Sequence, residues 1–97
     1  MTFPTSPQWH CAACAQPVTE NGYLEIDKPG THWTCWHREC DPNPEAATYW
    51  IEVDRIDTWA EVVEWTSHLA EKRWFHDTDW HTVMRETLWQ TERTNRP

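Results

Sequence analysis

Apolar and polar positions alternate with a period of two in the first half of this chain and follow a helical period in the last third. From residue 23, Tyr23 and Glu25 share one predicted face while Leu24 and Ile26 share the other, which indicates a strand. The turn signal at residues 28–30, Lys-Pro-Gly, leads into a predicted return strand at residues 31–34. Residues 48–54 alternate again and predict a third strand.

Two helices are predicted within residues 58–94. Thr58 and Glu61 have the spacing of a capping box, and a second helix is predicted to start at residues 77–79, where Asp and Thr side chains can cap it. The first helix should reach about Lys72. Its buried stripe is predicted to comprise Trp59, Val62, Val63, Thr66, Leu69 and Ala70. The second stripe comprises Trp80, Val83, Met84, Thr87 and Leu88. The short connection at residues 73–76 predicts an antiparallel helical pair.

Length and composition limit the possible architectures. A chain of 97 residues is expected to form a single domain over residues 1–97, which excludes multi-domain enzymes. This domain would contain a zinc-binding subregion at 10–41, the strand at 48–54 and the helical pair at 58–94. The sequence has no apolar run long enough to span a membrane, and its start does not have the layout of a secretion signal. We therefore expect no membrane association and a cytoplasmic location.

The cysteines occur in two separated groups near histidines. Cys11 and Cys14 form a C-x-x-C knuckle, in which both thiolates can turn toward one ion. Further along the chain, Cys35 and Cys40 each end an H-x-x-C step. In a reducing compartment such a pattern favours metal binding over two disulfides, and four ligands from two pairs satisfy the tetrahedral preference of structural zinc.

The second ligand pair has two candidates, His32 with Cys35 and His37 with Cys40. Successive side chains of a strand face opposite ways, so the step that starts in the predicted return strand is the poorer knuckle. We therefore predict one structural zinc ion bound by Cys11, Cys14, His37 and Cys40. Cys35 is the alternative ligand, which would give an all-cysteine site; otherwise it is a small buried thiol beside the site.

The segment Cys11-x2-Cys14-x22-His37-x2-Cys40, with Trp36 just before the histidine, resembles the first zinc site of a LIM domain and of treble-clef fingers generally. The resemblance covers about thirty residues, and no second zinc module follows, so the partner specificity of LIM domains does not carry over. Together with the periodicity, it implies an α+β fold: a small treble-clef-like knuckle and β-hairpin packed against the C-terminal antiparallel helical pair.

Catalysis is not expected. His37 and Glu39 form an H-x-E step, which in zinc deaminases places a catalytic glutamate beside a ligand, but here the C-x-x-C pair precedes it. A catalytic zinc needs an open coordination position, and this sequence supplies at least four ligands. A zinc hydrolase or deaminase is therefore the least favoured of three functional hypotheses.

The leading hypothesis is a zinc-stabilised module that binds another protein through acidic and aromatic surface. The net charge is −8, and nine tryptophans are available for the core and for contacts. Trp89 lies opposite the predicted stripe of its helix and Trp65 lies at the edge of its own stripe, so both are candidate partner contacts. The alternative is a nucleic-acid-binding regulator, disfavoured by the net charge. It would use Arg38, Arg55, Lys72 and Arg73.

A second resemblance spans most of the chain. It rests on His37 to Pro44, Tyr49-Trp-Ile, Thr58-Trp, Trp65-Thr-Ser-His-Leu and Thr78-Asp-Trp80. In these segments the chain resembles small zinc-finger-like proteins of actinobacteria and their phages. The resemblance implies no activity, but it implies the cytoplasm of a bacterial or phage-infected cell. A phage-encoded protein of this kind would be expected to modulate a host protein.

Overall fold

The structure is a computed structural model that describes residues 6–27 and 31–94, and it has the predicted α+β class. Three antiparallel strands form one sheet in the order β2-β1-β3. The strands are β1 (Gly22–Asp27), β2 (Trp33–His37) and β3 (Ala47–Glu52). The helices are α1 (Trp59–Leu69) and α2 (Trp80–Thr94). Four short 3-10 helices connect them in the described residues: η1 (Arg38–Cys40), η2 (Pro44–Ala46), η3 (Val53–Arg55) and η4 (Arg73–Asp77).

The strand predictions are confirmed in kind, with shifted ends. The return strand β2 starts and ends later than predicted and runs through His37, because its pairing with β1 extends to Gly22 opposite His37. β3 ends at Glu52, since the next three residues turn into η3. The predicted turn at 28–30 lies outside the described residues.

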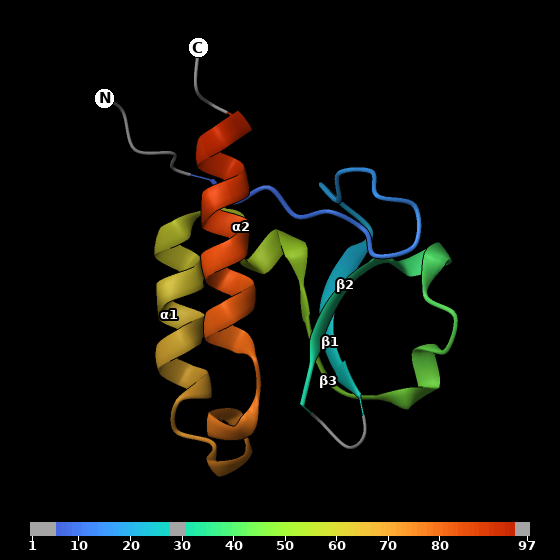
Figure 1. Cartoon of the computed structure of the whole chain (residues 1–97). Helices are drawn as coiled ribbons and strands as arrows, with labels where there is room; N and C mark the ends of the chain where they lie inside the picture. The colour runs from blue at the N-terminus through green and yellow to red at the C-terminus, as the bar shows by residue number, and fades with distance from the viewer. Residues whose placement is uncertain (1–5, 28–30, 95–97) are drawn as a thin grey trace.

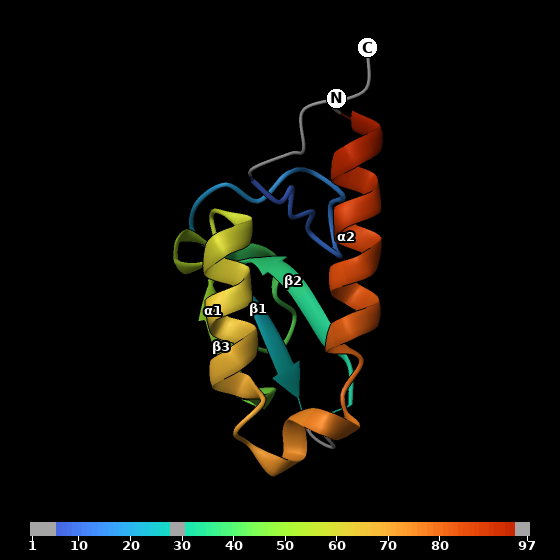
Figure 2. The same cartoon turned by 90° about the vertical axis from the view of Figure 1, so that its left-hand side faces the viewer.

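The helix predictions are also confirmed, with one shortened end. The capping box at the start of α1 is present, with Glu61 N–H donating to Thr58 Oγ1 and Thr58 N–H donating to the Glu61 carboxylate. α1 ends at Leu69 because Lys72 is already extended, at φ −94° and ψ 128°. α1 and α2 run in opposite directions (Figures 1 and 2). Among the described helices, none is long and apolar enough to cross a membrane.

The main core lies between the sheet and the two helices, which share one side of the sheet (Figure 1). Trp80 is 1% exposed, stacks edge-on against Trp33 at a centroid distance of 4.9 Å, and donates from Nε1 to Thr66 Oγ1 on α1. The prediction that Val63 belongs to the buried stripe is wrong, as is the prediction for Ala70: both are exposed. The stripe follows Val62 and Leu69, so the neighbouring positions turn toward solvent.

The opposite side of the sheet is covered by residues 38–46, which arch over it (Figure 1). Tyr23 and Glu25 face this side, as their alternation predicts, and both are buried. The Tyr23 hydroxyl donates to the Asp41 carboxylate at 2.5 Å, and Trp36 Nε1 donates to Glu25 Oε1 at 2.8 Å. The first contact ties the arch to β1, next to the segment that carries the second pair of candidate ligands, and the second contact joins β2 to β1.

Candidate metal centre

The first half of the site is a tight turn that contains Cys11 and Cys14. An isolated bridge between His10 and Pro17 closes the turn, Ala15 N–H donates to the Cys11 carbonyl at 2.8 Å, and Cys11 N–H donates to the Gln16 carbonyl at 3.0 Å. Ala15 takes a left-handed conformation, with φ at 63°, so that the chain can reverse directly after Cys14. Both thiols therefore project from one short turn, as a metal-binding knuckle requires.

The second half comes from the end of β2 and the 3-10 helix η1. His37 is the last residue of β2 and Cys40 is the last residue of η1, so one turn separates the two side chains. Gly22 pairs with His37 on the adjacent strand, and a Cβ there would collide with Val18 and lie 2.7 Å from the Trp36 carbonyl oxygen. Glycine at this position lets the strand after the knuckle approach β2 closely.

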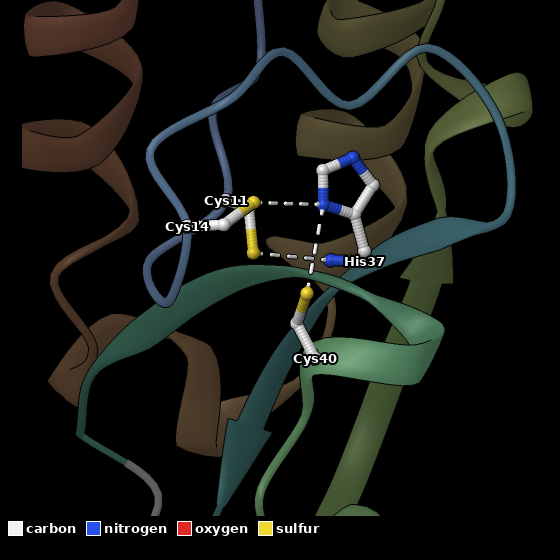
Figure 3. A group of neighbouring side chains, drawn as sticks. All are labelled: Cys11, Cys14, His37 and Cys40. Carbon is white, nitrogen blue, oxygen red and sulfur yellow. Dashed lines mark hydrogen bonds between the residues drawn. The ribbon is translucent and has the colours of Figure 1, made fainter.

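The four predicted ligands meet in space, with one donor atom from each residue within 4.8 Å of all the others (Figure 3). His37 Nδ1 lies 3.4 Å from Cys14 Sγ and 3.9 Å from Cys40 Sγ, while the His37 N–H donates to Cys11 Sγ at 3.4 Å. A tetrahedral zinc ion with bonds of about 2.0–2.3 Å needs ligand atoms roughly 3.3–3.8 Å apart. The group is thus close enough to bind a metal ion after small side-chain movements.

The orientation of His37 suits a ligand. Its Nε2 lies 3.0 Å from the Pro17 carbonyl oxygen, on the side of the ring away from the thiols. That contact requires the proton on Nε2, since a carbonyl only accepts, and so leaves the lone pair of Nδ1 directed at the sulfur atoms. Histidine ligands in metal sites characteristically donate their second ring nitrogen in this way.

The protein environment favours a thiolate at Cys11. Burial opposes ionisation of this thiol, but hydrogen bonds from the main-chain N–H groups of His37, Cys14 and Ala13 outweigh it and lower the pKa of Cys11 to about 6. Desolvation is the main cause that raises the pKa of Cys40 to about 11, and its contact with the Cys11 sulfur is the next largest. Without a metal ion, a thiolate at Cys11 thus opposes ionisation of Cys40. A divalent cation would remove this opposition, because it stabilises all the sulfurs as thiolates.

Cys35 lies outside the group of four. It pairs with Leu24 across the sheet and packs partly buried against the core, where burial raises the pKa of its thiol to about 12. His32, the partner of Cys35 in the competing step, instead lies 3.3 Å from the Asp79 carboxylate. All four cysteines are free, without a disulfide. The grouping therefore matches the donor set preferred from the sequence rather than its alternative.

The two tryptophans predicted to contact a partner occupy different surroundings. Trp89 on α2 is 56% exposed. Trp65 on α1 is half-buried at the edge of the core, with its ring 5.3 Å from that of His68. It lines a hollow of about 450 Å³. This α1 hollow is lined by Asp54, Arg55, Glu61, Glu64, Trp65 and His68.

Sequence reasoning did not identify the α1 hollow, because its residues come from η3 and α1 and only the fold brings them together. It also did not single out Trp50, which is 56% exposed on β3, although its place in an alternating strand could have predicted this. The glutamate of the H-x-E step, Glu39, is exposed in η1 between the two ligands.

Three of the four basic residues of the nucleic-acid hypothesis lie beside acidic or aromatic groups. Arg38 bonds to the Glu52 carboxylate at 2.7 Å, and Arg55 shares the α1 hollow with Glu61 and Glu64. The Lys72 ammonium lies 5.5 Å from the centre of the Tyr49 ring, and Arg73 is exposed in η4.

Comparison with protein-family models, with curated proteins and with solved structures gives no match for this chain.

Proposed function

We propose that this protein is a non-enzymatic interaction module whose fold is stabilised by one structural zinc ion, bound by Cys11, Cys14, His37 and Cys40. The observation that carries the proposal is the meeting of three thiols and one correctly oriented imidazole within 4.8 Å. Soft thiolates with an imidazole form a donor set that suits zinc. Such an ion contributes about 10–16 kcal/mol in small peptides, which is comparable to the whole stability of a domain.

The zinc ion would cross-link the segment before β1 to the segment at the end of β2. The knuckle precedes β1, whereas His37 and Cys40 follow β2, so four metal bonds would join segments more than twenty residues apart. Four protein donors complete a tetrahedral shell, and a complete shell leaves no position for a substrate or a reactive water. This supports a structural role and argues against a hydrolase or deaminase that uses Glu39.

The surface supports protein binding. The chain carries a net charge of −8 and exposes Trp89 on α2, and indoles are enriched among the residues that dominate binding energy. The α1 hollow adds Trp65 beside Glu61 and Glu64. A partner with a basic surface would complement these groups and would be steered toward them.

The treble-clef and LIM resemblance agrees with the order of knuckle, hairpin and second ligand pair along the chain. The wider resemblance to zinc-finger-like proteins of actinobacteria and their phages supports a cytoplasmic setting in a bacterial or phage-infected cell. In that setting the module would modulate a host protein.

Affinity capture tests this function. The zinc-loaded chain is immobilised and exposed to an actinobacterial lysate, beside the Trp89→Ala variant and a control, Trp50→Ala, that removes an equally exposed indole. We expect a specific basic partner that the wild type and Trp50→Ala retain and that Trp89→Ala loses. The same partner at equal strength on all three would remove Trp89 from the proposal. Capture of no specific protein would contradict an interaction role.

A further inference from the structure

The two edges of the sheet differ in how their main-chain groups are used. On the β2 edge, the Cys35 carbonyl accepts from Ala12 N–H at 2.9 Å, and Trp33 N–H donates to the Asp79 carboxylate at 2.8 Å. The knuckle and the start of α2 therefore close this edge. On the β3 edge, within the described part of the chain, no main-chain group of the strand bonds to anything except β1. β3 consequently presents an open row of donors and acceptors.

β3 has one irregularity, a bulge at Thr48 between the pairs Ile26–Tyr49 and Asp27–Ala47, and otherwise lacks the features that usually prevent an open edge from pairing. Edge strands are normally protected by charges, prolines or a covering segment. The strand has no lysine and no proline, and its single charge, Glu52, is already bonded to Arg38 at 2.7 Å. Trp50 is 56% exposed in its middle. An exposed, nearly neutral strand of six residues is a surface for strand addition.

We propose that the β3 edge pairs with the same edge of a second copy of this chain, giving a symmetric dimer with a continuous six-stranded antiparallel sheet. A two-fold axis through Trp50, in the regular part of β3 that follows the bulge at Thr48, sets Trp50 opposite its own copy and Tyr49 opposite the partner's Ile51. Side chains of the same face then meet, as antiparallel register requires. No two like charges lie opposite each other, and the two indoles form a cross-strand aromatic pair.

Charges beyond the strand favour this occupant. In this antiparallel arrangement the η2 end of one copy, with Glu45, lies beside the η3 end of the other, which contains Arg55 and Asp54. Glu45 and Arg55 are exposed, and in the described residues neither takes part in an ion pair within its own chain. The symmetry brings these opposite charges together twice, once at each end of the paired strands. At physiological salt, screening limits the longer-range repulsion between two chains that each carry a net charge of −8.

Sedimentation equilibrium of the zinc-loaded full chain tests the dimer from micromolar to near-millimolar concentration. We expect a reversible dimer for the wild type. Trp50→Lys should weaken it roughly tenfold or more, because two ammonium groups would face each other across the axis. Trp89→Lys, at an equally exposed indole outside the sheet, should leave it unchanged. A monomer at every concentration, or a dimer that Trp50→Lys leaves intact, would overturn the proposal.

Two further measurements locate the interface. Amide hydrogen exchange should slow in residues 48–52 as concentration rises, while β2 stays unchanged. Glu45→Arg should weaken the dimer, and the exchange of both charges, Glu45→Arg with Arg55→Glu, should restore it. Protection that appears on another surface, or a double variant as weak as the single one, would contradict this register. None of these measurements involves a host partner, so their outcome is independent of the capture experiment.

Discussion

The Nε2 atom of His37 lies 3.0 Å from the carbonyl oxygen of Pro17, a residue that also closes the turn containing Cys11 and Cys14. The knuckle thus supplies two of the candidate ligands and also orients a third one, which belongs to β2. This contact links the two halves of the metal centre before any metal binds. It makes His37 the residue on which the site can be tested most selectively.

Two replacements of His37, one without a metal-binding atom and one with a thiol, should show whether its side chain is a zinc ligand. His37→Ala removes a ligand, so its zinc affinity should fall by more than the roughly 10- to 100-fold that loss of a supporting contact costs. His37→Cys supplies a fourth thiolate and should retain stoichiometric zinc, because all-cysteine sites are also tetrahedral. Competition with a chromogenic chelator measures both affinities. Equal affinities for wild type and His37→Ala would mean that His37 is not a ligand.

The two cysteines that follow the hairpin should respond differently to substitution. Cys40→Ser should lose stoichiometric zinc by elemental analysis, whereas Cys35→Ser should keep one ion per chain, because its thiol packs against the core outside the group of four. Alkylation should also be slow at Cys35, since burial raises its pKa to about 12 and little thiolate forms. Loss of zinc from Cys35→Ser would assign a ligand role to Cys35.

Zinc affinity should fall steeply as the pH becomes acidic. The pKa of Cys11 is lowered from 9.0 to about 6, so this thiolate is present above about pH 6 and its contribution is lost as pH falls through that value. The pKa of His37 is raised from 6.5, chiefly by its hydrogen bond with Cys11, so His37 also takes up a proton as pH falls and then competes with the metal ion for its ring nitrogen. Affinity measured by chelator competition should therefore fall more steeply below pH 6 than at neutral pH. A constant slope would contradict the lowered pKa of Cys11.

Gly22 should tolerate no larger residue. Gly22→Ala places a Cβ against Val18 and the Trp36 carbonyl oxygen, and overpacking of this kind costs about 1–3 kcal/mol in the free energy of unfolding. Asn21→Gly is the neighbouring control, because Asn21 already has φ at 52°, where glycine is unstrained. Urea unfolding of the zinc-loaded chain measures both. A Gly22→Ala variant as stable as wild type would show that the strand can shift without loss.

The sequence predicts local features of this protein well because their causes are local. Thr58 and Glu61 lie three residues apart and form the predicted capping box, and the alternation of Leu24 and Ile26 places both in the core. The group of four candidate ligands could also be predicted from the sequence, since spacing alone restricts which thiols can turn toward one ion. The pair His37 and Cys40 was preferred to His32 and Cys35 because it was expected to follow the return strand, whereas His37 is the last residue of β2.

Other features depend on contacts between distant residues and could not be predicted. Trp9 is buried in the core, where its Nε1 donates to the Ile56 carbonyl 47 residues away, although the residues just before Cys11 have no periodic pattern. The closure of one sheet edge depends on Asp79, which directly precedes α2. The extension of β2 through His37 follows from pairing with β1 rather than from the residues of β2 themselves.

X-ray absorption at the zinc edge of the purified, metal-loaded chain tests the central claim most directly. A single ion bound by Cys11, Cys14, His37 and Cys40 predicts one zinc per chain with three sulfur neighbours at about 2.3 Å and one nitrogen at about 2.0 Å. A shell that contains a water oxygen, or a chain that folds with no stoichiometric metal, would contradict a closed structural site.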